Sequence, residues 1–255
     1  MRSEIRDRRA MPPFGAPAMV EIERQFEPAL HRIEKHSHLW VLAWLMDRAE
    51  RDVLQVTPRG VDRDAPDALH GVFSVRSPAR PNPIGLTAAR VKRIDGLSIH
   101  FDLLDFLDGT PVLDIKPYFV SRDMIYAAHN AAVGRPRDRQ ALRESLLFQA
   151  HRLQPERHPG VALAVRIAEH FRSEVMNWVE PADWHVETPL SRPYLAGALL
   201  GITRVSPGTG LHFIAEEKVV LNRLTVYVLK PGTAGYEQIL AATDDDLFQV
   251  DTISP

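Results

Sequence analysis

With 255 residues, 45% of them hydrophobic, and a net charge of −2, the sequence has the composition of an ordinary globular chain long enough for two domains. It has no cysteine, which excludes disulfides, thiolate nucleophiles, iron–sulfur clusters and cysteine-ligated zinc. The near-neutral charge excludes a strongly basic surface, so nucleic-acid binding would need a local patch such as Arg6, Arg8 and Arg9 or Arg135, Arg137 and Arg139.

The N-terminus is charged and lacks the apolar core of a signal peptide. No apolar run reaches the roughly 18 residues of a membrane span. We therefore expect no membrane association and a cytoplasmic location.

The first half of the chain predicts an antiparallel barrel or a strongly curved sheet. Residues 36–46 form a continuous apolar run, typical of a strand buried on both faces. Residues 97–106 alternate, and one face consists of Leu97, Ile99, Phe101 and Leu103. A turn at Asp108 and Gly109 leads into another strand that ends at Pro117. No glycine-rich phosphate loop is present, so a Rossmann fold is not expected.

A loop rich in proline, RSPARPNP at residues 76–83, lies between two strands. Proline has no N–H, so carbonyls near Pro81 and Pro83 would lack ladder partners and could accept from a ligand. Arg76 and Arg80 carry planar guanidinium groups that suit a carboxylate. These features favour a cofactor loop, and the alternative is a sheet-edge loop with two surface arginines.

The strand pair after this loop carries several carboxylates. Asp105, Asp108 and Asp114 fall within one predicted hairpin, with Lys116 close behind, and could face a cation or accept from an amine. Asp108 also fits an ordinary turn residue before glycine. Asp114 is flanked by apolar residues in its strand, a setting in which a carboxylate usually has a specific partner.

His36 and His38 have the spacing that puts two rings on one face of a strand, which could bind a metal. A third ligand is not apparent. We favour one packed and one solvent-facing histidine, and we predict no metal site.

The second half has a different pattern. Residues 126–157 are charged, with apolar positions at helical spacing, and are predicted to be a helical linker. A helix from about Val161 to Trp178 follows, with an apolar face at Val165, Ala168 and Val175. A small-residue segment, the strand LTVYVL, and an acidic helix and tail complete an α+β domain over residues 158–255.

Two motifs in the first half, GVFSVRSPARPNPIGL and LDGTPVLDIKPY, preceded by HSHLWVL, resemble the TsaA-like (YaeB-like) domain of the TrmO family. The resemblance implies a β-barrel over residues 1–125 and a homodimer with its cofactor pocket near the subunit interface. It also implies an S-adenosylmethionine-dependent methyltransferase acting on the exocyclic amine of threonylcarbamoyl-adenosine in tRNA. Family members open with a strand of the type Ile-Gly-x-Ile-x-Ser, and Met1 begins too late to include it, so that strand is lost or the start is misassigned.

The resemblance also implies functions for individual residues. Asp114 and the Asn82–Pro83 carbonyl region are the candidates for accepting a hydrogen bond from the amine nucleophile, because a delocalised amine must be held close and aligned. The implied cofactor-binding residues are His38, Arg76, Ser77, Arg80, Pro83, Asp105, Asp108, Thr110, Lys116 and Tyr118.

The second half is similar to the FmdE-like family through HPGVALAVRIA and GALLGITRVSPGTGLHF. That family typically has cysteine where this chain has His158, Ser191 and Ile202, and an acidic residue in place of Tyr194. A metal site of that kind is therefore not expected, and the domain is interpreted as a scaffold, dimerisation surface or substrate-selecting platform.

Two other functions remain open. One is methylation of a small molecule chosen by the FmdE-like domain, which the near-neutral charge favours. The other is a non-catalytic S-adenosylmethionine-binding module.

Overall fold

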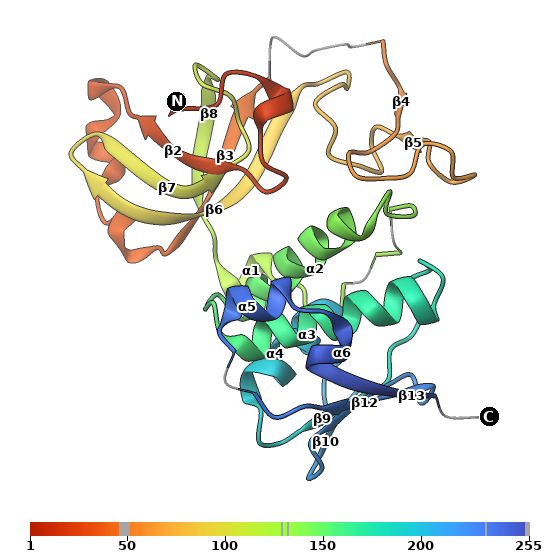
Figure 1. Cartoon of the computed structure of the whole chain (residues 1–255). Helices are drawn as coiled ribbons and strands as arrows, with labels where there is room; N and C mark the ends of the chain where they lie inside the picture. The colour runs from red at the N-terminus through yellow and green to blue at the C-terminus, as the bar shows by residue number, and fades with distance from the viewer. Residues whose placement is uncertain (46–51, 129, 132, 233, 253–255) are drawn as a thin grey trace. The chain divides into compact units, whose positions relative to one another are not determined.

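The computed structural model describes residues 1–45, 52–128, 130–131, 133–232 and 234–252, and the chain forms two compact units (Figure 1). The first unit contains residues 1–58 and 69–126, and the second contains residues 59–68 and 127–255. Among the described residues, no helix is both long enough and apolar enough to cross a membrane.

The first unit is built on a six-stranded antiparallel sheet with the strand order β1-β2-β7-β6-β3-β8. Its strands are β1 (Arg2–Ser3), β2 (Ala16–Glu21), β3 (His38–Trp44), β6 (Ile84–Asp95), β7 (Ser98–Leu104) and β8 (Val112–Pro117). A two-stranded ribbon, β4 (Gln55–Val56) and β5 (His70–Gly71), and the short helix α1 (Val120–Asp123) complete it. The described residues of this unit also form 3-10 helices at Arg8–Ala10, Arg24–Leu30 and Ile33–Lys35.

One face of this sheet carries the core of the first unit. Leu39, Val41 and Ala43 of β3 are fully buried, while the alternate residues of β3 are partly exposed. The apolar run at residues 36–46 was predicted to be buried on both faces, and the structure corrects this. The strand is buried on one face, and large apolar side chains on the other remain accessible.

The predicted alternation in β7 holds only as far as Phe101. Ile99 and Phe101 are buried, but Leu103 is 46% exposed and Leu104 is fully buried. The pairing of β7 with β2 shifts register here, since two steps along β2 match three steps along β7. This β-bulge inserts one residue, which moves the following side chains to the opposite face.

Two details of the predicted topology are corrected. An antiparallel barrel or a strongly curved sheet was expected, and the described strands form an open sheet with β1 and β8 at its edges, so the closed barrel is not found. The predicted hairpin after residue 97 does not form, because β8 pairs with β3 while β7 pairs with β2 and β6. The chain between β7 and β8 therefore crosses from the middle of the sheet to its edge.

The second unit combines helices with a five-stranded sheet of order β10-β9-β11-β12-β13. Its helices are α2 (Arg139–Leu153), α3 (Pro159–His170), a π-helical turn (Phe171–Val175), α4 (Pro193–Thr203), α5 (Tyr236–Ala241) and α6 (Asp244–Leu247). Its strands are β9 (Val186–Pro189), β10 (Leu211–Ile214), β11 (Lys218–Leu221), β12 (Thr225–Leu229) and β13 (Phe248–Thr252). This matches the predicted mixture of helix and sheet.

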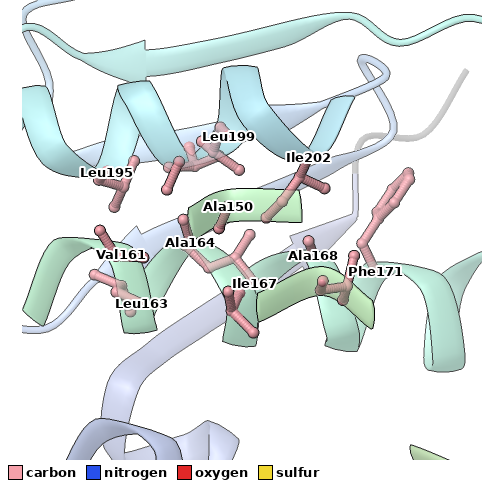
Figure 2. Close-up of a cluster of buried hydrophobic side chains, with 14 of the residues drawn as sticks. Ala150, Val161, Leu163, Ala164, Ile167, Ala168, Phe171, Leu195, Leu199 and Ile202 are labelled. Carbon is pink, nitrogen blue, oxygen red and sulfur yellow. The ribbon is translucent and has the colours of Figure 1, made fainter. Parts of the chain in front are cut away.

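Helix α3 lies at the centre of the second unit's core (Figure 2). Nine consecutive residues of α3, from Val161 to Glu169, are buried, so the helix is surrounded and has no solvent-facing side there. The helix predicted to run to Trp178 is α-helical as far as His170 and continues as the π-helical turn to Val175, whose side chain is 37% exposed rather than part of an apolar face.

Residues 126–157 were predicted to be a linker, and the structure differs. Leu142, Leu146 and Ala150 of α2 are buried in the same core as α3 and α4. A helix with a buried apolar stripe packs as part of a domain, so α2 belongs to the second unit.

Candidate functional site

Arg80 lies at the centre of the proline-rich loop that follows β5. Its Nε donates to the Ser77 carbonyl at 2.8 Å, and its Nη2 donates to the carbonyls of Val72 and Val75. The Ser77 hydroxyl accepts from the Ala79 N–H at 3.3 Å. The Arg80 side chain was predicted to bind a ligand carboxylate, but these three hydrogen bonds are made to the loop itself.

The end of this loop is also fixed by the protein. The Asn82 carbonyl accepts from the Ile84 N–H at 2.8 Å, and the Pro83 carbonyl accepts from the Leu45 N–H at 2.8 Å. Both carbonyls were predicted to lack protein partners, and the structure corrects this. Proline removes the donors within the loop, but donors from β6 and the end of β3 replace them.

Gly85, the second residue of β6, is closely packed against Phe106. A Cβ on Gly85 would lie 2.5 Å from Cε1 of Phe106, closer than any ordinary contact. Pro83 and Gly85 are both buried. The C-terminal end of the loop and the start of β6 are therefore held in place by packing.

Two of the loop's polar side chains remain accessible. Arg76 and Asn82 are exposed, and the structure gives neither side chain an ion pair or hydrogen bond among the described residues. These two groups are therefore available to a ligand, unlike most of the Arg80 guanidinium.

A second group of predicted residues lies on the face of the β3–β8 pair that points away from the core. The ring of Tyr118 lies 6.3 Å from His38 and 5.5 Å from Trp40, measured between centroids. Lys116 pairs across the strands with Trp40. Trp40 was not among the predicted site residues, although its alternate position in an apolar strand was a signal that it would face outward.

Asp114 lies on the same strand and has two partners. Its Oδ1 accepts from the Ile115 N–H at 2.8 Å, and its Oδ2 lies 2.5 Å from Nζ of Lys116. The side chain is 44% exposed. Asp114 was expected to have a specific partner, and Lys116 is that partner.

Asp105, Asp108 and Thr110 lie between β7 and β8 and serve local structure. Asp105 accepts from the hydroxyl of Thr87, and the hydroxyl of Thr110 donates to the Leu107 carbonyl at 2.7 Å. Asp108 accepts from the Ser3 N–H at 3.0 Å, which holds the pKa of its carboxyl below the ordinary value. Asp108 therefore fixes the N-terminal segment, as does the Thr110 carbonyl, which accepts from the Met1 amino group at 2.9 Å. The predicted contacts of Asp105, Asp108 and Thr110 with a cofactor stay predictions.

The histidines have aromatic and hydroxyl neighbours. His36 lies edge-on to Phe119 at 5.3 Å, and the Ser37 hydroxyl lies 2.9 Å from Nδ1 of His38. Within the described part of the chain, no group of three histidine or acidic side chains is placed to hold a metal ion.

Three residues of the second unit stand at positions where the FmdE-like family has cysteine or an acidic residue, and each of them makes local contacts. These residues are His158, Ser191 and Tyr194. The rings of His158 and Tyr194 stack at 3.8 Å, and Nδ1 of His158 accepts from the Gly160 N–H at 3.0 Å as the N-cap of α3. A hydrogen bond to Glu156 raises the pKa of Tyr194. Ser191 donates to Glu217.

The two basic clusters named from the sequence differ in availability. In the second cluster, Arg135 lies over the ring of Trp178 at 5.6 Å, Arg137 pairs with Asp138 at 3.1 Å, and Arg139 pairs with Glu169 at 3.0 Å.

The N-terminal cluster, which consists of Arg6, Arg8 and Arg9, makes fewer contacts within the described part of the protein. Arg6 pairs weakly with Asp108 at 3.7 Å. Arg8 and Arg9 are exposed on a 3-10 helix and, among the described residues, have no ion pair. The N-terminal cluster is therefore the better candidate for binding phosphates.

The chain matches a known family model. Residues 2–124 match the model of the tRNA-methyltransferase O N-terminal domain. A probable S-adenosyl-L-methionine-binding protein of Methanothermobacter thermautotrophicus is 40% identical over 129 residues, which are 49% of this chain and 89% of that protein.

Two longer proteins also match. A probable S-adenosyl-L-methionine-binding protein of Archaeoglobus fulgidus is 42% identical over 151 residues, 58% of this chain and 39% of that protein. A tRNA (adenine(37)-N6)-methyltransferase of Mus musculus is 40% identical over 98 residues, 38% of this chain and 22% of that protein. The chain therefore spans less than half the length of either of these two relatives.

Proposed function

The chain belongs to the family of proteins that carry the tRNA-methyltransferase O N-terminal domain, and from this we propose that it is an S-adenosylmethionine-dependent methyltransferase acting on tRNA. The proposed substrate group is the exocyclic amine of threonylcarbamoyl-adenosine. The names of the mouse and archaeal relatives support, respectively, the tRNA adenine and the cofactor.

The structural observation that carries the proposal is the fixed loop at residues 72–83. Its backbone is held by Arg80 and by donors outside the loop, while the side chains of Arg76 and Asn82 stay accessible. A preorganised loop loses little conformational entropy on binding, and a guanidinium matches a carboxylate. These groups fit the amino-acid end of S-adenosylmethionine.

The rings of Trp40 and Tyr118 provide a second kind of partner. Aromatic side chains stack on bases, and this contact tolerates any base because each has a π-face. We propose that the aromatic face formed by His38, Trp40 and Tyr118 holds an adenine ring, either of the cofactor or of the substrate.

Bound S-adenosylmethionine supplies an electrophilic methyl group, whose bond to sulfur breaks as its bond to the amine nitrogen forms, leaving the electron pair on sulfur. The protein must position the amine and accept its proton, because an adenine amine is a weak nucleophile. Asp114 is the better candidate for this acceptor, since a carboxylate that pairs with Lys116 retains free lone pairs. The carbonyls of Asn82 and Pro83 already accept from the backbone.

Replacing Arg8 and Arg9 together by glutamate is expected to raise the KM for tRNA roughly tenfold and to reduce the slope of its salt dependence by about two. The physical reason is the loss of two phosphate contacts. The KM for S-adenosylmethionine should not change. Initial rates of methyl transfer at several salt concentrations measure both values.

The matched control for that experiment is Arg137→Glu, because Arg137 already pairs with Asp138. This control should leave the KM for tRNA within about twofold of the wild-type value. Equal effects of the double variant and the control would mean that the N-terminal cluster does not contact tRNA.

The homodimer, the FmdE-like assignment of residues 158–255 and a cytoplasmic location remain proposals. The α+β architecture of the second unit supports the FmdE-like assignment. A tRNA substrate would place the protein in the cytoplasm.

The proposed homodimer needs an exposed apolar surface. On β6, Ile84 is 43% exposed and Leu86 is 41% exposed, and these side chains offer surface for a dimer contact.

A second candidate function is S-adenosylmethionine binding without catalysis, which the names of both archaeal relatives favour. Incubation with S-adenosylmethionine labelled in its methyl group and with bulk tRNA from a strain lacking this protein separates the two functions. Label in tRNA supports the methyltransferase. Cofactor binding with no label in tRNA or in small molecules supports the binding module.

A further inference from the structure

We propose that Arg80 is a positioning residue that shapes the cofactor loop from within, and that Arg76 is the arginine of this loop that binds the cofactor's carboxylate. The inference rests on the proposed binding of S-adenosylmethionine. It assigns different functions to two arginines that the sequence motif presents as equivalent.

The first step is the supply of hydrogen-bond donors in the loop. Pro78, Pro81 and Pro83 have no N–H, so half of residues 78–83 cannot donate from the backbone. The loop carbonyls of Val72, Val75 and Ser77 instead accept from the Arg80 side chain. One guanidinium, with five N–H groups in a rigid plane, thus replaces the missing amides.

The second step is the burial of these contacts. Val72 is 2% exposed and Ala79 is 8% exposed, so these two residues of the loop are buried. Arg80 itself is only partly exposed. Removing its side chain would leave carbonyls of the loop, including that of the buried Val72, without this partner, which disfavours this loop conformation.

The third step is the contrast with Arg76. This residue lies on the same loop, is exposed, and has no ion pair, hydrogen bond or ring contact among the described residues. A free planar guanidinium on a fixed backbone is the group that recognises a carboxylate at two points. Arg76 therefore has the properties of a ligand contact, and Arg80 those of an internal support.

The test uses two ligands that differ only in the carboxylate. These are S-adenosylhomocysteine and its decarboxylated analogue, S-adenosyl-3-thiopropylamine, and their dissociation constants are measured by calorimetry with the full chain. Arg76→Ala should weaken S-adenosylhomocysteine by about 10- to 100-fold and change the decarboxylated analogue by less than about threefold. Arg80→Ala should weaken both ligands by the same factor.

Hydrogen exchange without ligand provides a second measurement. Arg80→Ala should speed amide exchange in peptides covering residues 72–83 and leave exchange in β3 and β7 unchanged. Arg76→Ala should leave exchange in the loop unchanged. Arg80→Lys should give an intermediate effect, because one ammonium cannot reach three carbonyls in a plane.

Lys92→Ala on β6 is the control for loss of a surface charge. It should alter neither the affinities nor the exchange. A selective loss of the carboxylated ligand in Arg80→Ala, or an equal loss of both ligands in Arg76→Ala, would overturn the inference. Failure of the wild-type protein to bind S-adenosylhomocysteine would instead contradict the proposed function.

Discussion

Replacing Glu169 by glutamine is expected to lower the free energy of unfolding of the second unit by about 3–5 kcal/mol. The Glu169 side chain is fully buried on α3. Its carboxylate accepts from Arg139 at 3.0 Å and from Arg143 at 2.7 Å and 2.9 Å, and lies 3.5 Å from Arg166.

The large loss of unfolding free energy in Glu169→Gln follows from the arginines that remain in the cluster. The glutamine variant keeps the three guanidinium groups and loses one of the carboxylates that balance them. Asp244 still pairs with Arg166 at 2.6 Å and with Arg139 at 3.1 Å, but Arg143, whose side chain is 25% exposed, loses its ion pair and the cluster keeps an excess of positive charge around the buried Arg166. An uncompensated charge at a buried position costs much more than a lost surface pair. Native-state hydrogen exchange in peptides of α3 measures the change in opening free energy.

Glu174→Gln is the matched control. Glu174 pairs with Arg139 at 3.6 Å but its side chain is 53% exposed, so water screens the contact. Its replacement should cost less than about 1 kcal/mol. Similar losses in the two variants would show that burial of the Glu169 carboxylate does not determine the stability of this cluster.

Asp114→Ala is expected to lower kcat for methyl transfer to tRNA by about 10²-fold or more, with the KM for S-adenosylmethionine within about threefold of the wild-type value. The reason is the loss of the acceptor that aligns the amine. Asp114 lies on an edge strand, is 44% exposed and has its charge balanced by Lys116, so the fold should tolerate the change. Steady-state kinetics with both substrates measures this effect.

Asp102→Ala is the control for Asp114. Asp102 lies on β7 of the same sheet, is 37% exposed and pairs with Arg90 at 3.7 Å. It should retain kcat within about twofold. If the two aspartate variants have equal kcat values, Asp114 does not act in the reaction.

Three strands of the first unit were predictable, while the order in which they pair was not. The continuous apolar run locates β3, the alternation locates β7, and the turn at Asp108 and Gly109 together with Pro117 locates β8. These local patterns do not predict the crossing that places β8 beside β3, since pairing depends on contacts between distant parts of the chain. The bulge in β7 was hidden for the same reason, because Leu103 and Leu104 are equally apolar and only the pairing partner decides which one is buried.

The candidate site shows a similar division. The sequence points to the proline-rich loop and Asp114 as candidates through residue types and motif spacing, and their binding and catalytic functions stay predictions. It did not distinguish Arg76 from Arg80, since both are arginines four residues apart and only the folded loop shows which guanidinium is engaged. The sequence predicted that Asp114 has a specific partner. The structure shows that this partner is Lys116, which lies two residues further along the same strand.

The most direct test of the account is the identity of the nucleoside that receives the methyl group. Bulk tRNA from a strain lacking the protein is incubated with purified protein and labelled S-adenosylmethionine, digested to nucleosides and analysed by mass spectrometry. The account predicts label on the N6 nitrogen of threonylcarbamoyl-adenosine, with unlabelled nucleoside consumed in equal amount. Absence of label from every tRNA nucleoside, under conditions in which the protein binds S-adenosylmethionine, would contradict it.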